Sequence, residues 1–212
     1  MHQVRSPGYV IWLLVALHAA CASPPRYSAL PAGTSVLAFG DSVTHGTGAG
    51  PGQDYPSLLG AISGWDVHNY GVPGDTSAGA KARLEGALDE TRPALVIVEI
   101  GGNDFLRRTP EAEVKANIRG ILQIVKQAGI PVVLVATPRF SLAGAAFGSL
   151  PDAELYAQLA QEDDVPLVPN VFAAVLSDPS LKSDAIHPNA EGYKHMTEGI
   201  AAALRALGLL SP

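Results

Sequence analysis

The sequence predicts an α/β fold in which helices cover both faces of a parallel sheet, giving three layers. Short runs of apolar, β-branched residues recur along the chain, and segments with apolar residues at helical spacing lie between them. Parallel strands need crossover connections, and the crossover helices cover the sheet on both sides. The run Leu95-Val96-Ile97-Val98 contains no polar residue, as expected of a strand that is buried on both faces.

The expected strands are, in chain order, Ser35–Phe39, Asp66–Tyr70, Leu95–Ile100, Val132–Ala136 and Pro166–Val168. Apolar stripes predict one helix around Ala80–Leu88 and another around Val114–Val125. Pro151–Glu154 is expected to open a third helix, with Asp or Ser as its cap and acidic residues in its first turn. The last helix should run from Ala190 to about Leu207.

Residues 1–22 are expected to form an export signal, because Arg5 precedes an eight-residue apolar run that small residues follow. The run is too short to span about 30 Å of hydrocarbon. Two ends of the signal fit the sequence. His18–Cys21 resembles a bacterial lipobox, which would tether the protein to a membrane through lipidated Cys21, whereas ordinary cleavage after Ala22 would release it. Both ends place the protein outside a bacterial cytoplasm: periplasmic, membrane-anchored or secreted. Residues 23–33 would then be a linker and residues 34–212 the folded domain.

Composition excludes several classes of function. The chain has 212 residues, a net charge of −6 and one Cys. A nucleic-acid binder would carry clustered Lys and Arg, and this sequence has no basic run. One Cys rules out an internal disulfide framework and a Cys-rich zinc site. His45, His68 and His195 have no metal-ligand spacing, so we expect no metal. We also expect no cofactor and no nucleic-acid partner.

Polar and glycine-rich motifs follow the first three predicted strands, and a fourth motif lies near the C-terminus. They are Gly40-Asp41-Ser42-Val43-Thr44, Gly71-Val72-Pro73-Gly74-Asp75-Thr76-Ser77, Gly101-Gly102-Asn103-Asp104 and Asp184-Ala185-Ile186-His187-Pro188. Each motif alone is equally typical of an ordinary turn or helix cap. In parallel sheets, however, ligand sites lie beyond the carboxyl ends of the strands, so we expect these motifs to meet there.

Together the motifs supply the groups that acyl transfer requires. Ser42 is the candidate nucleophile, His187 the base that takes its proton, and Asp184 the acid that orients the imidazole. The N–H groups of Ser42 and Gly74 and the side-chain amide of Asn103 are expected to donate to one oxyanion. A nucleophile elbow of the α/β-hydrolase type does not fit, because Thr44 occupies its second Gly position.

The four motifs resemble the sequence blocks of the SGNH, or GDSL-type, hydrolase superfamily, which is named after Ser, Gly, Asn and His. They occur in the family's order and cover the chain from about residue 35 to its end. The resemblance implies a five-stranded, flavodoxin-like sheet, a triad of Ser42, Asp184 and His187, and an oxyanion hole from Ser42, Gly74 and Asn103. Gly-Asp-Thr-Ser at 74–77 and Val-Pro-Leu-Val-Pro at 165–169 look most like the small bacterial thioesterase I, lysophospholipase and arylesterase group. The implied activity is hydrolysis of small acyl esters or thioesters through an acyl-enzyme, by a monomer.

Other interpretations remain open. The same groups would serve a carbohydrate acetyl esterase, and a non-catalytic lipoprotein would bind glycan or lipid on the same scaffold. The loop at 138–148 is longer and more apolar than in the thioesterase group, and we expect Phe140 and Phe147 either to line an acyl groove or to pack on the core. Glu99, at the end of the third strand, has no assigned role.

Overall fold

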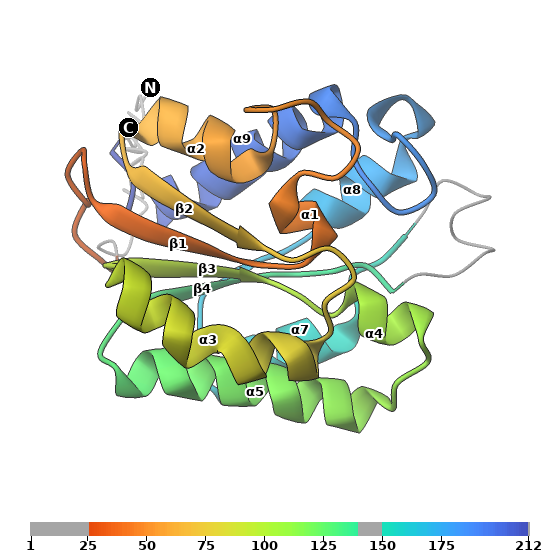
Figure 1. Ribbon diagram of the computed structural model, residues 1–212, viewed down its shortest axis with the longest axis horizontal. Coiled ribbons are helices and arrows are strands. Elements are labelled where there is room, and N and C mark those ends of the chain that lie inside the picture. Colours follow the sequence, from red (N-terminus) through yellow and green to blue (C-terminus); the bar gives the residue numbers. More distant parts are fainter. Residues whose placement is uncertain (1–25, 140–149, 212) are drawn as a thin grey trace, which may run out of the picture.

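The computed structural model describes residues 26–139 and 150–211 and contains the expected parallel sheet (Figure 1). Its strands are β1 (Ser35–Gly40), β2 (Asp66–Gly71), β3 (Leu95–Glu99), β4 (Val132–Val135) and β5 (Leu167–Val168). They lie in the order β2-β1-β3-β4-β5, which is the flavodoxin-like order. All five predicted strands are therefore confirmed, and each differs from its expected range by one residue.

Helices cover both faces of the sheet, so the three-layer prediction is also confirmed (Figure 1). One face carries α2 (Tyr55–Ser63), α8 (Val171–Ser177) and α9 (Ala190–Ala206), and the other carries α3 (Ser77–Thr91), α5 (Glu111–Gln127) and α7 (Glu154–Glu162). The short helices α1 (Ser42–His45) and α4 (Gly102–Leu106) follow β1 and β3, and a 3₁₀ turn, η1 (Pro179–Leu181), follows α8. Within the described ranges, no helix is long and apolar enough to cross a membrane.

The sheet separates two apolar cores. Successive side chains of a strand point to opposite faces, so Val36 and Ala38 of β1 pack in one core and Leu37 and Phe39 in the other. The predicted stripe of α5 is entirely buried in the second core: Val114, Ile118, Ile121, Leu122 and Val125. Each fully buried aliphatic side chain contributes about 1.5–3 kcal/mol, so this stripe holds α5 against the sheet.

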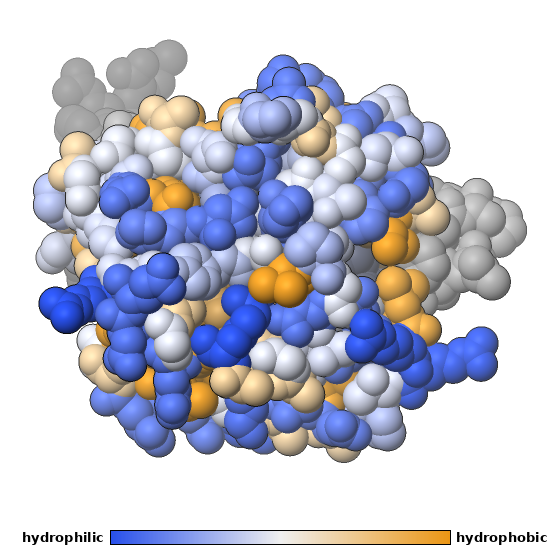
Figure 2. All heavy atoms as spheres, in the orientation of Figure 1, coloured by the Kyte–Doolittle hydropathy of each residue, from blue (hydrophilic) through white to orange (hydrophobic). Residues whose placement is uncertain are grey.

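Apolar side chains are scattered singly over the mostly hydrophilic face in Figure 2, and one group of them lies over α4. Large apolar residues that remain exposed in the described chain are Ile62, Val72 and Leu106. Single exposed apolar residues are ordinary on a folded protein. The face in this view therefore presents no apolar surface that needs an explanation.

The expected opening of the third helix is wrong in detail. Helix α7 begins at Glu154, and its N-cap, Ala153, makes no side-chain capping bond. Asp152 instead forms an antiparallel bridge with Pro138 and accepts a hydrogen bond from the N–H of Asn170 at 2.6 Å. Pairing with the chain that leaves β4 draws residues 151–153 away from the helix, so Asp152 cannot cap it.

Residues 26–33, expected to belong to a linker, pack on the domain. The N–H groups of Tyr27 and Leu30 donate to the carbonyls of Leu207 and Leu209 at 3.0 and 2.9 Å. The side chains of Tyr27 and Leu30 contact the core beneath α2 and α9. The interpretation as a free linker is thus wrong for this part, because its aromatic and aliphatic side chains have a core to bury in. The export signal and Cys21 lie outside the described residues and stay predictions.

Candidate active site

The ends of three neighbouring strands lie level at one edge of the sheet. Gly40, the last residue of β1, pairs with Gly71 of β2 on one side and with Glu99 of β3 on the other. A Cβ at Gly40 would lie 2.0 Å from the carbonyl oxygen of Glu99, so only Gly allows this approach. The loops that carry Ser42, Gly74 and Asn103 therefore leave the sheet side by side.

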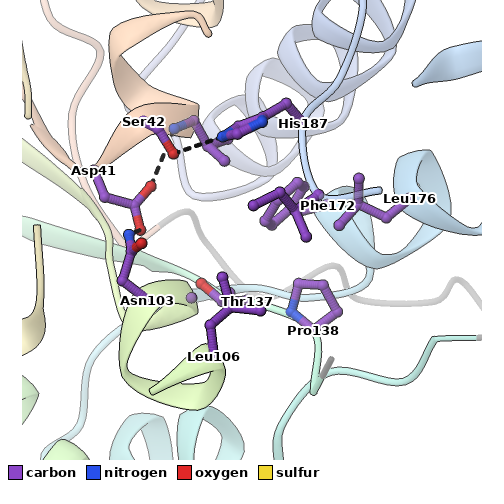
Figure 3. Close-up of a pocket in the computed structure, with 12 residues that line it drawn as sticks. Asp41, Ser42, Asn103, Leu106, Thr137, Pro138, Phe172, Leu176 and His187 are labelled. Atoms are coloured by element: carbon purple, nitrogen blue, oxygen red, sulfur yellow. Dashed lines mark hydrogen bonds between the residues drawn. The ribbon is translucent and has the colours of Figure 1, made fainter. Parts of the chain in front are cut away.

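Ser42, His187 and Asp184 form a continuous hydrogen-bonded chain, of which Figure 3 shows the part between Ser42 and His187. The Oγ of Ser42 lies 2.9 Å from Nε2 of His187, and Nδ1 of His187 lies 2.8 Å from Oδ2 of Asp184. A carboxylate at Nδ1 favours the tautomer in which that nitrogen carries the proton, leaving Nε2 as an acceptor. The imidazole is thus placed to accept the hydroxyl proton of Ser42.

Asp184 is held in its ionised form. Its partial burial raises the pKa, but the ring of His187 and the N–H groups of Ile186 and His187 donate hydrogen bonds. Together these hydrogen bonds lower the pKa by more than burial raises it. The net pKa of Asp184 is therefore below its ordinary value. The resulting negative charge stabilises the imidazolium that forms when His187 takes a proton.

The loop that carries Asp184 and His187 is fixed at both ends. The N–H of Ser183 donates to the carbonyl of His187 at 3.0 Å, and Asn189 caps α9 by accepting from the N–H of Gly192 at 3.0 Å. The glycine-rich loop after α1 packs against it, since a Cβ at Gly48 would lie 2.2 Å from the Oγ of Ser183. These contacts align His187 with Ser42, which is 145 positions away in the sequence.

Asp41 connects the nucleophile turn to Asn103. Its Oδ1 accepts from the N–H of Val43 at 3.0 Å, and its Oδ2 accepts from Nδ2 of Asn103 at 3.1 Å. Burial raises the pKa of Asp41 to about 6, against the opposing effect of these two hydrogen bonds. Because a carboxylate can only accept, Asp41 fixes which end of the Asn103 amide faces it and leaves that amide's second N–H for another acceptor.

Gly74 occupies the corner of a tight turn. The N–H of Asp75 donates to the carbonyl of Val72 at 3.1 Å, Pro73 stands at the second position, and Gly74 at the third has φ +80°. This is the pattern of a type II turn, which requires a positive φ at its third residue. Among the described residues, the N–H groups of Gly74 and Ser42 have no protein acceptor.

The structure brings four of the five predicted site residues together. Ser42, Asn103 and His187 line one pocket, and Asp184 contacts His187. Gly74 does not line this pocket. It is connected to the site through its carbonyl, which accepts from Nη2 of Arg107, the C-cap residue of α4, at 2.9 Å.

Glu99 lies buried beneath the site. Its carboxyl oxygens accept hydrogen bonds from the hydroxyls of Thr44 and Thr137, at 3.3 and 3.2 Å. Burial, together with the nearby charge of Asp41, raises the pKa of Glu99 well above its ordinary value. Burial thus disfavours the ionised form of Glu99, whose side chain joins α1, β3 and the segment after β4.

Apolar side chains form the wall of the pocket beside Ser42: Val43, Leu106, Pro138, Phe172, Leu176 and Ile186. Sequence reasoning missed Phe172 and Leu176, because it did not predict α8, which supplies both. The apolar run that follows β5 was a weak signal, since seven residues are too few to establish a helical period. Phe140 and Phe147 lie outside the described residues, so their expected part in an acyl groove stays a prediction.

The described ranges contain no group of three or more His, Cys, Asp and Glu that could hold a metal ion.

Comparison with known proteins gives consistent similarities. Residues 38–195 match the GDSL-like lipase/acylhydrolase family. The thioesterase 1/protease 1/lysophospholipase L1 of Escherichia coli K12 is 33% identical over 179 residues, which cover 83% of this chain and 86% of that protein. The arylesterase of Vibrio mimicus is 30% identical over 183 residues, covering 84% and 91%. The crystal structure of AlinE4, an SGNH-hydrolase family esterase, is similar with a TM-score of 0.64 at 33% identity, covering 84% of this chain and 97% of that one.

Proposed function

Because this chain belongs to the GDSL-like lipase/acylhydrolase family and is a carboxylic ester hydrolase, we propose that it cleaves acyl esters and thioesters with Ser42 as nucleophile. The proposal rests on the hydrogen-bonded chain from Ser42 through His187 to Asp184. This chain opens onto a pocket with apolar walls, which suits an acyl group. The relatives named as thioesterase, lysophospholipase and arylesterase support the same range of substrates.

In the first half of the reaction, the Oγ of Ser42 attacks the carbonyl carbon of the substrate while Nε2 of His187 takes the hydroxyl proton. The negative charge that forms on the carbonyl oxygen accepts hydrogen bonds from the N–H groups of Ser42 and Gly74 and from the amide of Asn103. When the intermediate collapses, His187 gives its proton to the departing alcohol or thiol. The acyl group remains as an ester on Ser42.

In the second half, His187 takes a proton from a water molecule that attacks the acyl-enzyme. The same three donors stabilise the second oxyanion, and the proton returns to Ser42 as the carboxylic acid leaves. Asp184 keeps its charge throughout and stabilises the imidazolium form of His187. The protein supplies every catalytic group that these reaction steps use, so the reaction as proposed needs no cofactor.

A substrate panel with Ser42→Ala tests the proposal. The panel consists of an aryl acetate, a long-chain p-nitrophenyl ester, an acyl-CoA and a lysophospholipid, and the wild-type protein should hydrolyse members of it. Ser42→Ala should lose this activity while keeping the far-UV circular dichroism of the wild type. Wild-type turnover in folded Ser42→Ala would refute the mechanism. Faster turnover of an acetylated polysaccharide would identify a carbohydrate acetyl esterase, and failure of an organophosphonate to label Ser42 would identify a non-catalytic binder.

We also propose that the protein works outside the cytoplasm, on the evidence of the signal-like residues 1–22. Mass spectrometry of the mature N-terminus distinguishes a lipidated Cys21 from a free terminus at Ser23. An intact Met1 on protein recovered from the native host would contradict export through a cleaved signal.

A further inference from the structure

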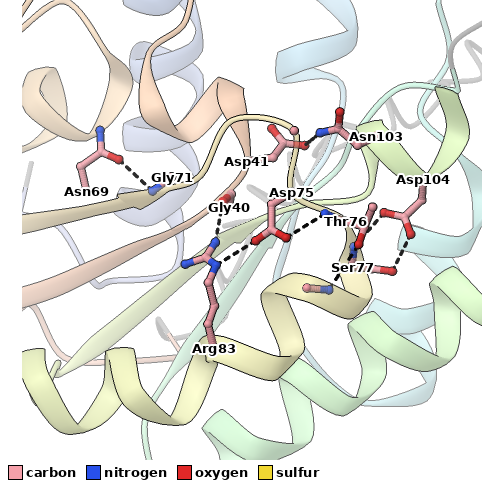
Figure 4. A network of polar contacts seen from close by, with 12 residues as sticks. Gly40, Asp41, Asn69, Gly71, Asp75, Thr76, Ser77, Arg83, Asn103 and Asp104 are labelled. Atoms are coloured by element: carbon pink, nitrogen blue, oxygen red, sulfur yellow. Dashed lines mark hydrogen bonds and ion pairs between the residues drawn. The ribbon is translucent and has the colours of Figure 1, made fainter. Parts of the chain in front are cut away.

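Arg83 of α3 joins the turn that carries Gly74 to the end of β1 (Figure 4). Its Nε donates to Oδ2 of Asp75 at 2.8 Å, and its Nη2 donates to the carbonyl oxygen of Gly40 at 2.8 Å. Asp75 directly follows Gly74, and Gly40 directly precedes the Asp41-Ser42 pair. One guanidinium therefore links the two segments whose N–H groups are proposed to donate to the oxyanion.

The guanidinium of Arg83 is itself held in place. Its Cζ lies 4.1 Å from the centroid of the buried ring of Phe39, and its side chain is only 26% exposed. Asp75 is 11% exposed, so the ion pair is largely shielded from solvent. A planar guanidinium that stacks on a ring and donates in two directions has a defined position, whereas a Lys ammonium could not reproduce both bonds.

Other contacts hold the two ends of the Gly74 turn, whereas at its corner the Gly74 carbonyl accepts from Nη2 of the exposed Arg107 side chain at 2.9 Å. At the start, the N–H of Val72 donates to the carbonyl of Gly40 at 3.1 Å. At the far end, the N–H and hydroxyl of Ser77 both donate to buried Asp104 at 2.8 Å. At the corner, a Cβ on Gly74 would meet no atom within 4 Å, so packing contributes little there.

We propose that Arg83 is a positioning residue for the oxyanion hole, because it fixes the Gly74 N–H relative to Ser42 through Asp75 and Gly40. The inference rests on the proposed function. Oxyanion donors act only within about 2.7–3.1 Å of the charged oxygen, so a small displacement of an unpacked turn forfeits the interaction. Arg83 also balances the charge of Asp75, whose repulsion contributes to the raised pKa of Asp41.

The test compares Arg83→Met, Arg83→Lys and a matched control, Arg119→Met, on p-nitrophenyl acetate. Met keeps an aliphatic stem against Phe39 but removes both hydrogen bonds. Arg119 is a comparable control, since it is a helix arginine, 32% exposed, that pairs with Asp163 and does not line the site pocket. We expect Arg83→Met to lower kcat roughly 10- to 100-fold with little change in KM, which is less than the roughly 10²–10³ lost with a whole donor. Arg83→Lys should recover only a small part of this loss, and Arg119→Met should keep kcat.

A second variant separates positioning from a general loss of folding. In Arg83→Ala, added guanidinium or ethylguanidinium ion should raise kcat severalfold, whereas it should not do so in the wild type. Wild-type kcat in folded Arg83→Met, or a loss confined to KM, would overturn the inference. Organophosphonate labelling distinguishes failure of the proposed function from failure of the role of Arg83. An unlabelled wild type means that the proposed function fails. A labelled wild type with a fully active Arg83→Met means that only the role of Arg83 fails.

Discussion

Asn103 donates a hydrogen bond to the buried carboxylate of Asp41, across 62 positions of sequence and from a different strand end. The bond orients a proposed oxyanion donor, and it depends on the charge of Asp41. Burial raises the pKa of this carboxyl group to about 6. A carboxylate with a raised pKa disfavours its own ionised form, so the site retains this orientation at a cost in stability.

Asp41→Asn is expected to lower kcat while raising stability. An amide has an NH2 group in place of one of the two carboxylate oxygens that accept from Val43 and Asn103. One of these two donors would then face another donor, and Asn103 would lose its fixed orientation. The loss in kcat should not exceed the roughly 10²–10³ for a missing oxyanion donor. In the wild type the folded pKa exceeds the ordinary 3.8, so stability falls as pH rises from 3.8 to about 6. Denaturant unfolding at pH 7 should show Asp41→Asn more stable by up to about 3 kcal/mol.

A double variant tests whether Asp41 acts through Asn103. Asn103→Ala should lower kcat by roughly 10²–10³. If Asp41 serves to orient that amide, then Asp41→Asn should cost little more in the Asn103→Ala background. Additive losses in kcat would contradict this relationship, and Asp66→Asn, an exposed acid on β2, provides the control substitution.

Glu99→Gln should keep activity and change the pH dependence of stability. Burial raises the pKa of Glu99 well above 4.5, so the folded protein keeps a proton that the unfolded chain loses. The wild type should therefore lose about 1.4 kcal/mol of stability for each pH unit above 4.5, until the folded pKa is reached. Gln keeps the shape and can still bond Thr44 and Thr137. The melting temperature should favour Glu99→Gln increasingly from pH 5 to pH 7, and a difference independent of pH would show that Glu99 is ionised in the fold.

The central strands could be predicted because strands buried on both faces are almost entirely apolar, as in Leu95–Glu99. The meeting of the motifs could also be predicted, since Gly40, Gly71 and Glu99 end their strands at one edge of a parallel sheet. Helix α2 was missed although its N-cap, Asp54, and the Pro in its first turn are recognisable signals.

The supporting contacts could not be predicted from the sequence. Arg83 reaches Gly40 across 43 positions, and such a contact depends on how α3 lies against the sheet rather than on any local pattern. The pocket wall is a similar case, because Phe172 and Leu176 belong to a helix of seven residues whose periodicity is too short to recognise. Sequence motifs thus predicted the reacting groups, whereas tertiary packing determines the residues that hold and surround them.

Leu106→Ala should reduce the preference for longer acyl chains. Leu106 lines the pocket but is 44% exposed, so its truncation removes contact with substrate at little cost to the fold. Each methylene buried in the pocket contributes about 0.8 kcal/mol, so kcat/KM for p-nitrophenyl octanoate should fall severalfold while that for the acetate stays unchanged. Ile62→Ala on α2 is the matched control, since Ile62 is 51% exposed and does not line the pocket. An equal loss for acetate and octanoate in Leu106→Ala would mean that the acyl chain does not lie against α4.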